Sequence, residues 1–175
     1  MTKEILKEKA CAAIDAYADK IKAICASIND EPELGFKEVK TAAKVAEFMR
    51  DLGLGRRTTV LAINGVKGRA KGGKPGPTAA VLGELDAVGC PTSPKADPAT
   101  GAAHACGHNL QISTMLAAAC GIVKSGVLPE LAGDVVFFGV PAEEYIEIAY
   151  RKKLVESGKL HFMSGKGELI YEGAF

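Results

Sequence analysis

The sequence predicts an α/β fold, a three-layer domain with a largely parallel mixed sheet flanked by helices. Two apolar segments, Thr78–Leu85 and Asp134–Val140, read as buried strands, and a helical pattern over 109–124 lies between them. A strand–helix–strand unit of this kind places its ligand site beyond the carboxyl ends of the parallel strands. Acidic residues follow both predicted strands, so we expect the functional site at that edge of the sheet.

Composition restricts the class of partner. The 175 residues carry a formal net charge of +1 at pH 7, and no basic run favours nucleic acid or an anionic membrane. The N-terminus mixes charges where a signal peptide would be apolar, and Met115–Val123 is too short to cross a bilayer. We therefore expect a cytoplasmic protein that binds neither nucleic acid nor membrane.

The cysteines indicate a reducing compartment. Their number is odd and no C-x-x-C spacing occurs, which argues against a disulfide scaffold. Cys11, Cys25 and Cys120 stand in helical segments rich in Ala and Ile, so we expect them to be small core residues.

Two helices are predicted in the N-terminal third. Helical spacing of apolar residues runs from about residue 3 to Asn29, where a cluster ending in Pro32 stops the helix. A second apolar stripe runs from Val39 to Leu52, and Gly53 suits the left-handed residue that commonly ends a helix.

The segments between and after these elements are shorter. Thr58–Ile63 and Val66–Lys71 flank Asn64-Gly65, a pair typical of a hairpin turn because both residues tolerate positive φ. A glycine- and proline-rich loop then leads into the strand that begins at Thr78. A last helix is expected over Glu147–Ser157, and the tail 159–175 shows no clear periodicity.

Cys106 and His108 form the first chemically informative cluster, at the predicted start of the 109–124 helix. A helix N-terminus lowers the pKa of a thiol, so Cys106 is expected to be thiolate-like, and Gly107 allows the turn that lets both side chains meet one ion. A thiolate and an imidazole are strong zinc ligands.

The second cluster is the pair Glu143 and Glu144, just after the second strand. One carboxylate can bind a metal while its neighbour accepts a proton from water, although paired glutamates are also common on solvated surfaces. Asp86 follows the first strand and either orients a ligand or caps the next turn. His104 either supports a ligand or is exposed, and His161 is expected at the surface.

Four motifs give the chain a family resemblance. They are Asn29–Phe36, Gly83–Val88, His104-Ala-Cys-Gly-His-Asn109 and Pro141-Ala-Glu-Glu144. In order and spacing they resemble the N-terminal part of the M20 family of metallopeptidases and amidohydrolases, and the aminoacylase and aminobenzoyl-glutamate hydrolase branch in particular. The resemblance covers almost the whole chain and implies a zinc-peptidase-like fold.

The resemblance also implies roles for individual residues. Cys106, His108 and Glu144 would be metal ligands, Glu143 the general base, and Asp86 and His104 possible supporting residues. Members bind two divalent ions, zinc or manganese, and hydrolyse amide bonds of N-acyl or aminoacyl amino acids or short peptides. Asn109 stands where many relatives have Asp, and Gln111 stands where many have a second His.

Length is the larger departure from the family pattern. Family enzymes are roughly twice as long, with a dimerising lid domain and further ligands, so residues 1–175 are expected to be the N-terminal portion of a truncated catalytic domain. We expect this portion to be inactive alone and to form homo-oligomers.

Two alternatives remain open: a non-catalytic metal-binding or interaction module, and a cysteine hydrolase with Cys106 as nucleophile.

Overall fold

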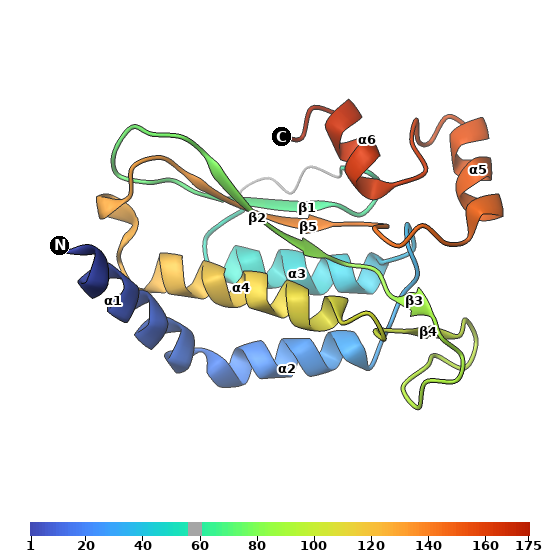
Figure 1. The fold of residues 1–175 in the computed structure, drawn as a ribbon, viewed down its shortest axis with the longest axis horizontal. Helices are drawn as coiled ribbons and strands as arrows, with labels where there is room; N and C mark the ends of the chain where they lie inside the picture. The colour runs from blue at the N-terminus through green and yellow to red at the C-terminus, as the bar shows by residue number, and fades with distance from the viewer. Residues whose placement is uncertain (56–60) are drawn as a thin grey trace.

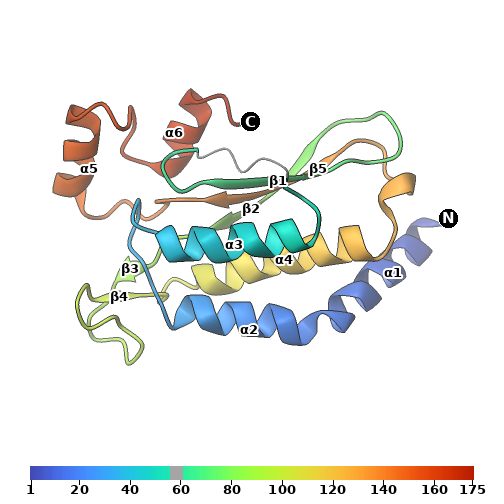
Figure 2. The same cartoon turned by 180° about the vertical axis from the view of Figure 1, so that it is seen from behind.

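The computed structural model describes residues 1–55 and 61–175, and helices cover both faces of its main sheet (Figures 1 and 2). The helices are α1 (Lys3–Ala16), α2 (Ala18–Asn29), α3 (Val39–Asp51), α4 (His108–Lys124), α5 (Ile148–Glu156) and α6 (Gly165–Tyr171), with a 3₁₀ turn at Leu128–Glu130. The strands are β1 (Val66–Ala70), β2 (Ala79–Glu84), β3 (Val88–Gly89), β4 (Ala102–Ala103) and β5 (Val135–Val140). In both views α1 to α4 lie on one side of the sheet, and α5 and α6 lie on the other.

The main sheet is mixed, in the order β1-β5-β2. β2 runs parallel to β5 with Glu84 opposite Val140, whereas β1 runs antiparallel to β5. The predicted strand–helix–strand unit is confirmed, because α4 connects these two parallel strands. β3 and β4 form a separate two-stranded ladder in the crossover before α4.

The core lies between this sheet and α4. The buried side of α4 includes Ile112, Met115, Leu116, Ala119 and Cys120, which pack in one cluster with Phe137 of β5. Helix and strand approach closely at Gly83, where an added Cβ would lie 2.8 Å from the side chain of Ile112. None of the described helices combines the length and hydrophobicity needed to cross a membrane.

The single helix predicted over residues 3–29 is interrupted at Tyr17. That residue leaves helical geometry (φ −104°, ψ 4°), so the chain bends and continues as α2. α1 meets α4 through Ala10 and Ile14, which lie against Gly121. Cys11 points away and is exposed, so its expected place in the core was wrong, whereas Cys120 is buried and Cys25 is partly buried.

The predicted hairpin is only partly right. β1 matches the expected second strand, but the positive φ angles occur at Ala62 (46°) and Ile63 (70°), not at Asn64-Gly65. Gly65 is needed for another reason, since an added Cβ would lie 2.6 Å from the carbonyl oxygen of Leu61. Half of the first predicted strand, residues 58–60, lies outside the described part of the chain.

The C-terminal tail contains a short helix that sequence periodicity did not indicate. Ser164 caps α6 by accepting a hydrogen bond from the Gly167 amide, and Leu169 packs fully buried in one cluster with Phe138 and Val140 of β5. His161 is exposed, as expected. With seven residues, α6 makes only two turns and is too short to produce a recognisable apolar stripe.

Candidate metal centre

Acidic and metal-ligating side chains gather where β2 and β5 end and α4 begins. Ligand atoms of Cys106, His108 and Glu144 all lie within 4.8 Å of one another. A second group with the same spacing contains Glu84, His108 and Glu143, so the two groups share one imidazole. The topology explains this convergence, since parallel β2 and β5 bring their carboxyl ends to one edge.

His108 is oriented so that Nδ1 faces Asp86 and Nε2 faces three glutamates. Its Nδ1 lies 2.8 Å from the carbonyl oxygen of Asp86, which can only accept, so Nδ1 carries the proton. Nε2 lies 3.1 Å from Glu84, 3.7 Å from Glu143 and 3.8 Å from Glu144. Burial alone would lower the pKa of His108, but hydrogen bonding to Asp86 and the nearby acids outweigh it and raise the pKa to about 9.

Asp86 connects the two sides of this cluster. It is fully buried, and its Oδ2 accepts a hydrogen bond from the Glu144 amide at 2.9 Å. Its Oδ1 lies 3.4 Å from Nδ1 of His108 and has no hydrogen-bond partner among the described residues. Asp86 thus fixes both His108 and the Glu144 main chain, which is the orienting alternative considered from the sequence.

Cys106 does not have the environment predicted from the sequence. Gly107 adopts the expected left-handed turn (φ 97°) and caps α4, which places Cys106 just before the helix. The hydrogen bond to Glu144, desolvation and the surrounding carboxylates raise the pKa of the thiol to about 11. The expected thiolate character was therefore wrong for the protein without a metal, because the hydrogen bond to Glu144 and the surrounding carboxylates favour the neutral thiol.

Sequence reasoning missed Lys166 and the role of Glu84. Lys166, on α6, reaches the cluster and lies 2.5 Å from Glu84 and 3.7 Å from Glu143. Glu84 also accepts a hydrogen bond from the Gln111 side chain at 3.1 Å. The i, i+2 spacing of Glu84 and Asp86 at a strand end was an available signal, whereas nothing near Lys166 pointed to this edge.

His104 is buried rather than exposed. Neither ring nitrogen has a hydrogen-bond partner among the described residues. Burial, together with repulsion from His108, lowers the pKa of His104 to about 4, so the ring is neutral at pH 7.

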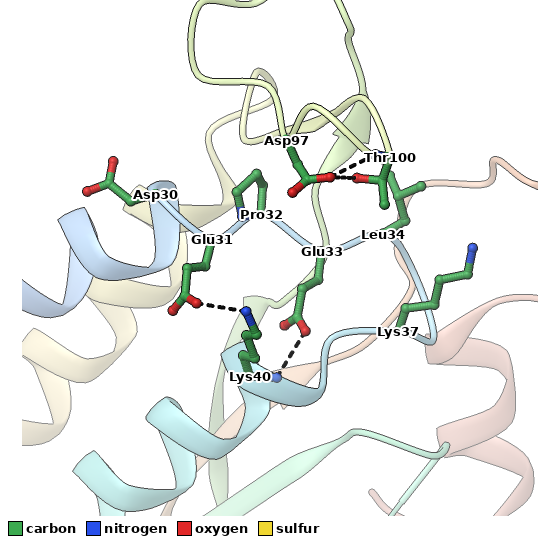
Figure 3. A pocket seen from close by; sticks show the side chains of 9 residues that line it. All are labelled: Asp30, Glu31, Pro32, Glu33, Leu34, Lys37, Lys40, Asp97 and Thr100. Carbon is green, nitrogen blue, oxygen red and sulfur yellow. Dashed lines mark hydrogen bonds and ion pairs between the residues drawn. The ribbon is translucent and has the colours of Figure 1, made fainter.

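A surface hollow lies along the Asn29–Phe36 segment, and the carboxylates of Glu31, Glu33 and Asp97 that line it already have partners (Figure 3). Glu31 forms an ion pair with Lys40 at 2.8 Å, and Glu33 accepts from the Lys40 amide at the start of α3. Asp97 accepts from Thr100 in a local turn. These contacts stabilise the loop, so the cluster around His108 remains the better candidate site.

Known proteins resemble most of the chain. A thermostable carboxypeptidase of Saccharolobus solfataricus is 32% identical over 89% of the chain, and an N-acetylcysteine deacetylase of Bacillus subtilis is 29% identical over 78%. A solved structure described as a dinuclear metal binding peptidase from the M20 family, also from B. subtilis, aligns with a TM-score of 0.65 and 28% identity over 82% of the chain. This chain is homologous to the M20 family.

The match covers most of this chain but less than half of each relative. The chain spans 40% of the length of the carboxypeptidase, 36% of the deacetylase and 40% of the solved M20 peptidase chain. No family model matches the chain. The fold class and the M20 resemblance inferred from the motifs are confirmed by these relatives, while the individual residue roles remain predictions.

Proposed function

We propose that residues 1–175 form the N-terminal portion of an M20 catalytic domain that hydrolyses amide bonds with the help of divalent ions. Cys106, His108 and Glu144 would hold one ion. The observation that carries this proposal is the orientation of His108, whose Nδ1 is held by Asp86 while Nε2 faces the other donors. A donor set of thiolate, imidazole and carboxylate suits zinc and other borderline ions.

The proton chemistry falls to Glu143 in this proposal. A divalent ion, when bound, polarises the scissile carbonyl and lowers the pKa of water, so that the water can lose a proton and attack at neutral pH. The Glu143 side chain is about one-third exposed (35%), so it can reach substrate and solvent, and it lies beside Nε2 of His108. It would accept the proton of the attacking water and deliver it to the leaving amine nitrogen.

The second ion, the metal and the substrate follow from the family resemblance. The Glu84, His108 and Glu143 group shares its imidazole with the first site, and one ring nitrogen binds one ion, so a second ion needs further donors. We infer zinc or manganese as the metal and N-acyl amino acids or short peptides as substrates. The names of the relatives, a carboxypeptidase and an N-acetylcysteine deacetylase, support this substrate class.

A chimera tests the proposed function. Residues 1–175 would replace the matching part of the S. solfataricus carboxypeptidase, which extends well beyond this chain. We expect the chimera to hydrolyse N-acyl amino acids or dipeptides. A chelator should abolish this activity, and Glu143→Gln should reduce it by ~100- to 10,000-fold. The chain by itself should bind metal but show little turnover, because its three donors all lie on one side of the ion.

The same experiment separates the alternatives. A chimera that keeps its metal but shows no turnover would favour a non-catalytic metal-binding module. Alkylation of Cys106 that abolishes turnover even when metal is absent would favour a cysteine hydrolase. The raised pKa of Cys106 argues against the latter, since a nucleophilic thiol requires neighbours that lower its pKa.

A further inference from the structure

Arg151 is a buried cation whose hydrogen bonds all go to main-chain carbonyls. Its side chain is fully buried in α5, and it donates to the carbonyl oxygens of Met163 (2.7 Å), Ala142 (3.2 Å) and Glu144. Among residues 1–55 and 61–175 no carboxylate forms an ion pair with it. Buried arginines are rare without an ionic partner, so the carbonyls that it holds require an explanation.

Glu38 holds the same segment through the backbone amide of Ala142. This carboxylate is also fully buried, and it accepts hydrogen bonds from the Ala142 amide at 2.7 Å and from Asn64 at 3.0 Å. Ala142 is therefore held at its amide by Glu38 and at its carbonyl by Arg151. Ala142 adopts a left-handed conformation (φ 50°), which a residue with a Cβ keeps only when its surroundings impose it.

The held segment is the one that carries the two glutamates of the candidate centre. Arg151 contacts the carbonyl of Glu144, while Asp86 accepts from the amide of the same residue. Gly35 makes room for this arrangement, because an added Cβ would lie 2.3 Å from the Arg151 guanidinium and 3.0 Å from Ala142. Gly35 belongs to the Asn29–Phe36 motif, so this motif contributes to the site by leaving room for Arg151 and Ala142.

We propose that Arg151 and Glu38 are positioning residues that hold the 142–144 backbone so that Glu143 and Glu144 face His108. The proposal rests on the proposed function, since the aim of the positioning is the metal centre. Neither residue touches substrate or metal in this account. Both act through the peptide groups of Ala142 and Glu144.

The test uses the full 175-residue chain and Co²⁺ as the probe metal. Arg151→Lys keeps the charge but loses the fork that reaches several carbonyls. Glu38→Gln keeps an acceptor for the Ala142 amide, whereas Glu38→Leu removes it. Lys152→Met, next to Arg151 but largely exposed, is the matched control. The readouts are Co²⁺ affinity from the thiolate-to-cobalt absorption and amide exchange in the metal-free protein, residue by residue.

We expect Arg151→Lys and Glu38→Leu to weaken Co²⁺ binding by ~10- to 100-fold, the usual effect of losing an outer partner of a metal ligand. The Ala142 and Glu144 amides should exchange at least ~10-fold faster, while amides in the middle of α4 stay protected. Glu38→Gln and Lys152→Met should behave like the parent chain. If Glu38→Leu does not fold, Arg151→Lys alone decides.

Parent-like Co²⁺ affinity and parent-like exchange at Ala142 and Glu144 in Arg151→Lys would overturn the positioning role. A general loss of protection that includes α4 would also overturn it, because the residue would then be needed for the whole fold. Failure of the parent chain to bind Co²⁺ is a different result. It would contradict the metal centre, while the exchange data would still decide whether Arg151 and Glu38 hold the segment.

Discussion

Glu143 and Glu144 are adjacent in the chain but differ in what fixes them. The Glu144 amide is bound by Asp86 and its side chain belongs to the Cys106 and His108 group, whereas Glu143 contacts Lys166 and is more exposed. Glu144→Gln should therefore weaken zinc binding by more than the ~10- to 100-fold typical of outer residues, and Glu143→Gln should change it little. Calorimetric zinc titration measures both affinities. Equal losses would mean that the two glutamates share one role, and a larger loss in Glu143→Gln would exchange the roles.

Lys166 places a positive charge where a cation is proposed to bind. Its ammonium group lies beside Glu84 and Glu143, and these acids outweigh desolvation and raise its pKa, so it stays charged at pH 7. Lys166→Met removes repulsion against the incoming ion and should strengthen zinc binding by up to ~10-fold, a modest figure because the lysine is partly solvated. The exposed Lys159→Met is the control. Weaker zinc binding in Lys166→Met would show that the lysine supports the site instead.

Glu38 should make the stability of the chain depend on pH. Burial raises its pKa to about 7, above the ordinary 4.5 expected for the unfolded chain. The folded protein thus keeps a proton that the unfolded chain releases, so this contribution is full below pH 4.5 and is lost as the pH rises through 7. At ~1.4 kcal/mol per pKa unit the loss is roughly 3 kcal/mol.

Urea unfolding of the parent and Glu38→Gln measures this effect. The free energy of unfolding of the parent, relative to the Gln variant, should fall between pH 4.5 and pH 8. The Gln variant is the reference because it carries no ionisable group at this position. Parallel pH profiles for the two proteins would mean that Glu38 does not titrate in this range.

At the scale of single residues, local chemistry was easier to predict than environment. The thiol of Cys106, the imidazole of His108 and the two glutamates could be predicted because two clusters of ligating residues occur together, each at the end of a predicted element. The raised pKa of Cys106 was not visible, since it depends on Glu144, 38 positions away, which only the fold brings near. Lys166 and Arg151 were missed for the same reason: a lone basic residue in a helix has no local signal of what it contacts.

Among the elements, α6 provides the sharpest test of packing. Gly165 begins this helix directly against the end of β5, and an added Cβ would lie 1.6 Å from the carbonyl oxygen of Pro141. Gly165→Ala should therefore displace α6, and with it Lys166, at a cost near the upper end of ~1–3 kcal/mol for overpacking. Urea unfolding measures the loss. Gly89→Ala, with open space around the added Cβ, is the control; an unchanged midpoint in Gly165→Ala would mean that α6 is not docked as described.

The elements that could be predicted are those with long regular patterns. The 17 residues of α4 and the apolar runs of β2 and β5 gave the strand–helix–strand unit directly. The break at Tyr17 was not predicted because apolar spacing continues across it. The turn at Ala62 and Ile63 was not predicted because positive φ at such residues is imposed by tertiary contacts and is not favoured by their side chains.

At the scale of the whole molecule, β2 forms an open edge of the main sheet in the described part of the chain. Ala79, Ala80 and Leu82 of this strand are exposed, which leaves apolar side chains beside unpaired backbone groups. Such edges favour pairing with another chain, so we expect a dimer or larger species in solution. Leu82→Lys should shift the population toward monomer, as measured by light scattering. A monomeric parent would contradict this expectation.

Bound zinc is the measurement that tests the central claim most directly. The parent chain, loaded with zinc and dialysed, should retain about one ion per chain, held by thiolate, imidazole and carboxylate donors. Cys106→Ser and His108→Ala should each lose that zinc while the far-ultraviolet circular dichroism stays close to that of the parent. Equal zinc content in the parent and both variants, measured by elemental analysis, would contradict the metal centre on which the proposed function depends.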